Sequence, residues 1–315
     1  MKRALILILT VFPLAGACRT PDAEELPEAV APPPAPAPQA EILGPRTVST
    51  AAPEFAASID AEGTELYFNR ASDDRSELVV LVSRRLDGAW GEAEAVAFST
   101  GAFRDVDPFV TADGSRLFFS SDRPDAGETE PGDFDIWFVE RAADGDWGEP
   151  VNLGAPVNSA GTEIYSTLAR NGNLYFGSDR GGEGGLYRSR FADGVYGEPE
   201  PLVFGGGDAW SDASNPAIAP DESFLVFSAD RDDGLGGSDL YVSFRQEDEW
   251  TQPRRLAEPV SSAFADFAPT VGWDGRHLFW TSERPGIVAA GAVEGRPPGD
   301  LYRIEWASFE SSGSE

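Results

Sequence analysis

One unit of strands and turns occurs five times in this sequence of 315 residues, and the repetition limits the fold more than any other feature. Each copy contains a tight two-residue turn, and the second members of successive turns lie 51, 58, 50 and 53 residues apart. The turns are Glu62-Gly63, Asp113-Gly114, Asn171-Gly172, Asp221-Glu222 and Asp274-Gly275. Asp-Gly and Asn-Gly turns between β-rich runs indicate hairpins, so each copy is expected to contain antiparallel strands.

A short strand led by leucine follows each turn, and a third strand follows that one. The first set reads LYF at 66–68, LFF at 117–119, LYF at 174–176, LVF at 225–227 and LFW at 278–280. The third strands lie at 77–82, 135–140, 185–190, 239–244 and 300–305. In the first four copies a connection such as WGEP at 147–150 leads to a fourth strand. Repeats of about 50 residues with four strands each are typical of propeller blades.

The fifth copy lacks the fourth strand, and the segment before the first copy can supply it. Residues 41–63 align with residues 149–172 of the third copy. A strand at about residues 42–48 would therefore complete the last blade and leave no long unpaired edge. We predict an all-β fold, a five-bladed β-propeller of four-stranded antiparallel blades over residues 42–306, closed by this N-terminal strand.

The repeated motifs resemble those of a known family. The LYF-x-S-D-R strand at 174–180, the D-L-Y strands at 239–241 and 300–302 and the W-G-E-P connection are together similar to the WD-type propeller repeats of TolB-like proteins. The resemblance covers about residues 41–306 and implies a β-propeller of the bacterial envelope. It says little about activity, because propellers include binding modules, scaffolds and enzymes.

The chain is strongly acidic, with 24 Lys and Arg against 54 Asp and Glu and a formal net charge of -30. A surface of this sign repels phosphate backbones and anionic lipid headgroups. We therefore expect no nucleic-acid partner, and we expect membrane attachment through a lipid anchor only.

The N-terminus has the pattern of a secretory signal peptide over residues 1–17. Lys2 and Arg3 precede an apolar run too short to span a bilayer, and small residues precede Cys18. This arrangement resembles a bacterial lipobox, which implies cleavage before Cys18 and its lipidation. Arg19, by the same resemblance, favours the outer membrane. The alternative is ordinary secretion with a free cysteine.

Two further segments lie outside the repeats. Residues 18–41 comprise the lipidated cysteine and a tether that is rich in Pro and Ala and carries scattered acids. Residues 307–315 are expected to form a disordered tail.

Nearly every copy has an acid just before its innermost strand. In a propeller the first residues of these strands surround one mouth of the central channel. These acids are Glu54, Asp105, Glu163, Asp212 and Asp266. Arginines follow the second strands at Arg123, Arg180, Arg231 and Arg284. Either the acids form a funnel that binds a cation or a basic peptide, or they pair with the arginines and are structural. We favour the structural interpretation, because an unpaired ring of like charges would be costly.

The sequence supports one functional hypothesis and leaves two alternatives open. Acids that recur in register favour architecture over catalysis, so we expect a non-enzymatic, monomeric envelope lipoprotein that acts as a protein-interaction or scaffold module. The long loops at 122–135 and 283–300 are the expected surface for an envelope protein partner. The alternative is a periplasmic propeller that binds a small molecule or glycan, and a hydrolase is the third interpretation. We expect no catalytic residues, no metal and no cofactor.

Overall fold

The computed structural model describes residues 39–72, 74–124, 130–205, 210–288 and 297–306, all within one compact unit, Ala37–Glu315. The signal peptide, Cys18, the tether as far as residue 38 and the C-terminal tail lie outside the described residues. Among the residues described, no helix is long and apolar enough to cross a membrane.

The described strands form five antiparallel sheets, and each sheet has four strand positions in order from the innermost to the outermost. The innermost strands are β2 (Glu54–Ile59), β7 (Asp105–Val110), β11 (Glu163–Leu168), β17 (Ser214–Ile218) and β22 (Asp266–Val271). The second strands are β3 (Glu65–Ala71), β8 (Arg116–Ser121), β12 (Leu174–Ser178), β18 (Phe224–Ala229) and β23 (His277–Ser282). The third strands are β4 (Leu78–Leu86), β9 (Asp135–Glu140), β13 (Gly185–Ser189), β19 (Asp239–Gln246) and β24 (Asp300–Glu305).

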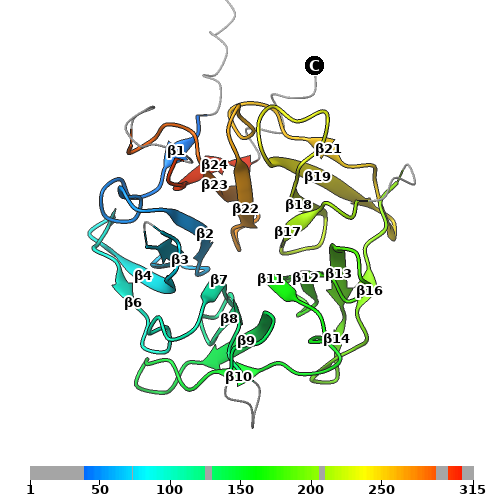
Figure 1. Ribbon diagram of the computed structural model, residues 1–315, viewed down its shortest axis with the longest axis horizontal. Helices are drawn as coiled ribbons and strands as arrows, with labels where there is room; N and C mark the ends of the chain where they lie inside the picture. Colours follow the sequence, from blue (N-terminus) through cyan, green and yellow to red (C-terminus); the bar gives the residue numbers. More distant parts are fainter. Residues whose placement is uncertain (1–38, 73, 125–129, 206–209, 289–296, 307–315) are drawn as a thin grey trace, which may run out of the picture. The chain divides into compact units, whose positions relative to one another are not determined.

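The outermost strands are short. They are β6 (Glu94–Ala95), β10 (Val151–Asn152), β16 (Glu200–Pro201), β21 (Arg254–Arg255) and β1 (Glu41–Ile42). Three small hairpin pairings accompany them, made by β5 (Ala89–Trp90) on β4, β20 (Glu249–Trp250) on β19, and β14 (Phe191–Ala192) with β15 (Val195–Tyr196). The innermost strands surround the centre of the ring (Figure 1). The predicted five-bladed β-propeller is confirmed.

The apolar core lies between blades, and the second strands show why. In each of the motifs LYF, LFF and LVF, alternate side chains point to opposite faces of the sheet. Leu117 and Phe119 pack with the first blade, whereas Phe118 packs with the third. The other four blades follow the same rule, so the middle residue faces the next blade and its two neighbours face the previous one. Each blade therefore depends on both neighbours for its burial.

The N-terminal strand completes the fifth blade, as predicted, but it is shorter than predicted. In β1, Glu41 pairs with Arg303 and Ile42 pairs with Tyr302 of β24, and the N–H of Leu43 donates to the carbonyl of Leu301 at 2.8 Å. The prediction of a strand over residues 42–48 is wrong in its extent. Gly44 has a φ of +51°, and its carbonyl accepts the N–H groups of residues 47 and 48, so the chain turns there.

This closure can be tested by shortening the chain. A variant that begins at Gly44 is expected to be less stable than one that begins at Gln39, because it lacks β1 and the buried Leu43, which is 2% exposed. Loss of one buried leucine costs about 2–5 kcal/mol of unfolding free energy. Chemical denaturation of both variants, with Leu43→Ala in the longer chain as a milder change, measures the effect. Equal midpoints for the two lengths would show that β1 does not hold the ring closed.

Candidate functional site

The structure brings each of the five mouth acids to an arginine of its own blade. The nitrogen–oxygen distances are 2.7 Å for Glu54–Arg70, 2.8 Å for Asp105–Arg123, 3.2 Å for Glu163–Arg180, 3.3 Å for Asp212–Arg231 and 2.7 Å for Asp266–Arg284. Four of the acids are fully buried, and Asp212 is exposed. The carboxylates at this mouth are therefore engaged in ion pairs and do not form an open anionic ring.

The second blade shows the common arrangement, in which a serine lies opposite the acid, at Asp105↔Ser121, and the arginine follows two residues later. The first and fourth blades depart from it, and both departures follow from the sequence. In the first blade Arg70 itself lies directly opposite Glu54. In the fourth blade Ala213 occupies the buried position, so the neighbouring Asp212 carries the charge at the surface.

Burial raises the pKa of two of these acids, Glu54 and Asp105. Burial raises the pKa of Glu54, and hydrogen bonds from Thr50 and the Arg70 guanidinium oppose it. Burial likewise raises the pKa of Asp105 against the charge of Arg123. The arginines therefore offset a desolvation cost that the carboxylates would otherwise impose on the fold.

A second ring of residues lies two positions after Glu54, Asp105, Glu163, Ala213 and Asp266. All five have positive φ: Ala56, Asp107, Tyr165, Asn215 and Ala268, with values of 50–57°. Each stands at a shift in the pairing register between the first and second strands. Such bulges redirect side chains, and here they direct them towards the propeller axis. Ala56, Tyr165 and Ala268 come from three different blades and pack together there.

Asp107 is the charged member of this axial ring. The residue is only 7% exposed, and among the described residues its carboxylate has no hydrogen bond and no ion pair, while its oxygens still reach the surface. Its backbone N–H donates to the Asn69 amide oxygen at 2.7 Å, which fixes its position. Burial raises the pKa of Asp107 to about 7. The nearby Tyr165 does not compensate it, because its hydroxyl donates to the carbonyl of Pro269 at 2.8 Å.

The mouth of this ring carries both apolar and polar side chains. Phe55, Ile164 and Phe267, from the first, third and fifth blades, are half-buried and pack against the cluster of Ala56, Tyr165 and Ala268. Asp107 and the partly exposed Asn215 come from the second and fourth blades, which adjoin the first and the fifth. We call this group the axial mouth. It combines aromatic surface with an unpartnered carboxylate, which marks it as a candidate functional site.

The axial ring was not predicted from the sequence. The predicted site residues were those that recur in nearly every copy, and the mouth acids recur whereas the axial residues differ. The signal that could have found Asp107 is the opposite one, because the position two residues after Glu54, Asp105, Glu163, Ala213 and Asp266 reads Ala, Asp, Tyr, Asn and Ala in the five blades. Asp107 is the one charged residue at a repeat position that is uncharged in the other four blades, so the repeated architecture does not require its charge.

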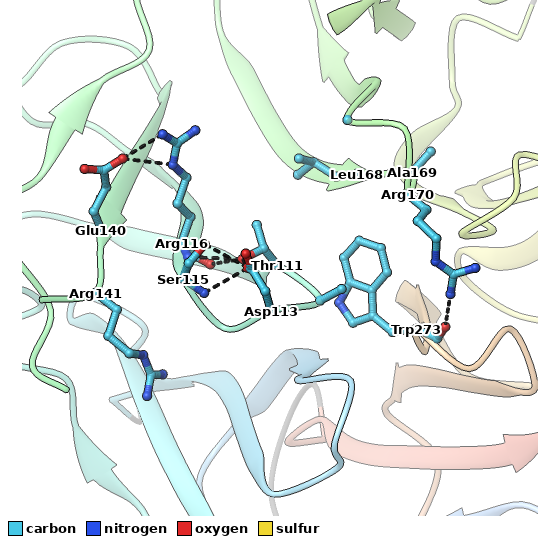
Figure 2. A pocket seen from close by; sticks show the side chains of 12 residues that line it. Thr111, Asp113, Ser115, Arg116, Glu140, Arg141, Leu168, Ala169, Arg170 and Trp273 are labelled. Carbon is cyan, nitrogen blue, oxygen red and sulfur yellow. Dashed lines mark hydrogen bonds and ion pairs between the residues drawn. The ribbon is translucent and has the colours of Figure 1, made fainter. Parts of the chain in front are cut away.

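The far end of the axis is closed by a tryptophan. Trp273, in the turn of the fifth blade, donates its indole N–H to the carbonyl of Val110 in the second blade at 3.0 Å. Arg170, in the turn of the third blade, donates to the carbonyl of Trp273 at 2.9 Å. Figure 2 shows Arg170 and Trp273 beside a pocket on the turn face, the end of the propeller that carries the two-residue turns. Through its side chain and its backbone carbonyl, Trp273 thus links three blades.

No arrangement of metal ligands accompanies these features. Within the described ranges, no group of three or more His, Cys, Asp and Glu side chains is placed to hold a metal ion. The predicted partner loops are described only in part, since residues 125–129 and 289–296 lie outside the described residues.

The sequence matches no protein-family model, and no curated protein matches it. Among solved structures the chain is similar to a putative TolB from Agrobacterium tumefaciens, with 15% identity, a TM-score of 0.51 and 86% of each chain covered. It is similar to an α-L-arabinofuranosidase from Podospora anserina in complex with cellotriose, with 12% identity, a TM-score of 0.51, and 84% of this chain and 94% of that one covered. It is also similar to a GH43 endo-arabinanase from Bacillus licheniformis, with 13% identity, a TM-score of 0.52, and 82% of this chain and 95% of that one covered.

At these identities the likeness shows a shared fold, and TolB-like propellers are among the structures that share it. The prediction that the chain is not an enzyme is contradicted by the other neighbours. It rested on acids that recur in register. Propellers of the same architecture include glycoside hydrolases, so recurring acids on this fold do not argue against catalysis.

The environment of Asp107 predicts a pH-dependent stability. Because burial raises its pKa from 3.8 to about 7, the folded protein holds this proton more tightly than the unfolded chain does. The contribution of Asp107 to stability is therefore fully present below about pH 4 and is lost as the pH rises through about 7. An amide side chain cannot ionise, so Asp107→Asn is expected to be more stable than the wild type at pH 8, by on the order of 3 kcal/mol.

The measurement is the denaturation midpoint of both proteins between pH 4 and pH 8. Asp144→Asn, which changes an exposed turn aspartate, is the matched control and is expected to follow the wild type. A constant difference between Asp107→Asn and wild type across this range would show that Asp107 titrates normally.

Proposed function

We propose that this chain is a ligand-binding β-propeller that holds a glycan, or a similar small polyhydroxylated molecule, at the axial mouth. The observation that carries the proposal is the Asp107 carboxylate, which is 7% exposed and has no partner among the described residues. A buried carboxylate without hydrogen bonds destabilises a fold. Hydroxyl groups of a ligand would supply the missing donors, so binding would relieve a cost that the free protein bears.

The apolar and polar side chains of the axial mouth fit a sugar ring. The rings of Phe55 and Phe267 offer an apolar surface on which the C–H face of a sugar packs. Asp107 accepts hydrogen bonds from hydroxyl groups, and the amide of Asn215 both donates and accepts. The small side chains of Ala56 and Ala268 occupy less of the axis than Tyr165 does in the third blade. This asymmetry leaves the first and fifth blades as the side on which a ring would stack.

The solved neighbours support the class of ligand. One is in complex with cellotriose, and another is an endo-arabinanase, so this fold serves glycan recognition in those proteins. The support concerns the fold, and the residues named here come from this chain alone.

Hydrolysis of a glycoside is the second candidate function, favoured by the same carboxyl group. An Asp whose pKa is raised to about 7 is partly protonated at neutral pH, as a general acid requires. A glycosidase also needs a second carboxylate as nucleophile or base. The nearby mouth acids, such as Asp105, are held by arginines, which makes them acceptors with a fixed geometry.

Glycan binding is tested on the mature chain with an array of neutral oligosaccharides, followed by calorimetry. We expect Asp107→Ala to weaken binding of the retained glycan roughly tenfold to a hundredfold, since a hydrogen bond to a charged group contributes about 1.5–3 kcal/mol. Phe267→Ala is expected to weaken it too, and Asp144→Asn to leave it unchanged. Chromatography of the incubated glycan separates binding from hydrolysis. Absence of any retained glycan, or binding indifferent to Asp107, would overturn the proposal.

We also propose that the protein is a lipoprotein of the bacterial outer membrane, anchored through Cys18. The basis is the N-terminal pattern of Lys2, Arg3, the apolar run and the small residues before Cys18. An envelope protein partner remains a prediction. Mass spectrometry of the protein extracted from membranes is expected to show an acylated N-terminal Cys18. An N-terminus elsewhere, or an unmodified cysteine, would contradict the anchor.

A further inference from the structure

A second pocket, distinct from the axial mouth, opens on the turn face. Its volume is about 670 Å³, within the range of small-molecule sites. The turns of the second, third and fifth blades line it together with the end of β9. The buried side chains of Leu168 and Trp273 supply apolar surface, and Trp273 lies between Asp113 and Arg170 (Figure 2). Its charged lining residues are Asp113, Arg116, Glu140, Arg141 and Arg170.

Two of the three arginines are already paired. Arg116 donates through Nε and Nη2 to one carboxylate oxygen of Glu140, at 3.0 and 2.7 Å. Arg141 donates to the carboxylate of Glu65 and to the hydroxyl of Tyr67, at 2.5 and 2.6 Å. Neither guanidinium is open to a ligand without losing an acid it already holds.

Arg170 is different. It is exposed and makes no ion pair with any residue that the structure describes. The acid that senses its charge is Asp221, whose pKa is lowered by hydrogen bonds from Ser223 and also by the charge of Arg170. The guanidinium of Arg170 donates from Nη2 to the carbonyl of Trp273, at 2.9 Å. Since Trp273 is itself held by Val110, that bond fixes the guanidinium at the edge of the pocket. A guanidinium fixed in this way binds an anion with less loss of side-chain freedom than a mobile one.

The rest of the lining selects the charge of that anion. Asp113 accepts hydrogen bonds from Thr111 and from Ser115, and these bonds lower its pKa, so it stays ionised at neutral pH. Asp113, Glu140 and the Glu65 that holds Arg141 therefore place three negative charges against the three arginines. The pocket has no surplus positive charge to attract a dianion, and Arg170 is the one arginine left to meet a singly charged ligand.

We infer that the turn-face pocket binds an organic monocarboxylate, with Arg170 as the residue that pairs with its carboxylate. The planar fork of a guanidinium matches the two oxygens of a carboxylate. The surface of Leu168, Ala169 and Trp273 packs against the carbon skeleton of the ligand. This site is independent of the axial mouth, which lies at the opposite end of the innermost strands.

The test is calorimetry on the mature chain at low salt with four probes. Sodium glucuronate and sodium hexanoate represent an acidic sugar and an aliphatic acid, glucose is the neutral counterpart of glucuronate, and inorganic phosphate supplies a dianion. We expect at least one carboxylate to bind more tightly than glucose and phosphate, and its affinity to fall as salt is added. Which of the two binds identifies the carbon skeleton. Failure of both carboxylates, or tighter binding of phosphate, would overturn the inference.

Variants assign the binding to Arg170. Arg170→Gln is expected to lower the affinity at least tenfold, and Arg170→Lys to lower it less, because lysine keeps the charge but loses the fork. The matched control is Arg276→Gln, on the same face, where Arg276 already pairs with Glu305 at 2.6 Å. Unchanged affinity in Arg170→Gln would overturn the assignment. Asp107→Asn is expected to leave this binding intact, which separates the result from the fate of the axial mouth.

A gain of affinity provides a measurement that misfolding cannot imitate. Glu140 is 60% exposed, so Glu140→Gln is expected to leave the fold intact. The change removes one negative charge and releases Arg116 towards the pocket, and it is expected to raise the affinity for the carboxylate several-fold. A lower or equal affinity would contradict the role assigned to charge in this pocket.

Discussion

Every blade of this protein depends on its neighbours, because the apolar core lies between sheets and not within them. The aromatic strand of each blade sends its middle side chain to the next blade and the flanking two to the previous one. A ring built in this way has no stable end, so the pairing of β1 with β24 is the contact on which the other interfaces depend. Closure also brings five strand starts to one mouth. The acids there are tolerated because each holds an arginine of its own blade.

The same closure creates the two places where the blades differ. Along the axis the five innermost strands meet, and their bulges direct one side chain from each blade inwards. Four of the five are uncharged, and Asp107 is left buried without a partner among the described residues. At the other end Trp273 spans the axis to Val110, and Arg170 is fixed against it. Repetition thus builds the scaffold, and the departures from repetition supply the chemistry at both ends.

The fold was accessible from the sequence because its determinants are local and repeated. The two-residue turns, the leucine-led strands and the missing fourth strand of the last copy predict the five blades and their closure. The arginine partners of the mouth acids follow from the same register. The length of β1 was missed because Gly44 adopts a positive φ that the alignment of repeats does not reveal. Asp107 and Trp273 were missed for another reason, since their surroundings come from other blades and exist only once the ring is closed.

The central claim is that Asp107 presents an unpartnered carboxylate to a ligand at the axial mouth. Its most direct test is a carbon-13 NMR titration of the aspartate side-chain carboxyl groups, with Asp107→Asn used to assign the signal. The account predicts that the carboxyl of the free protein titrates with a pKa of about 7 and that a bound glycan moves this value downwards. A pKa near 4 in the free protein would mean that water or another group already solvates Asp107, and it would contradict the account.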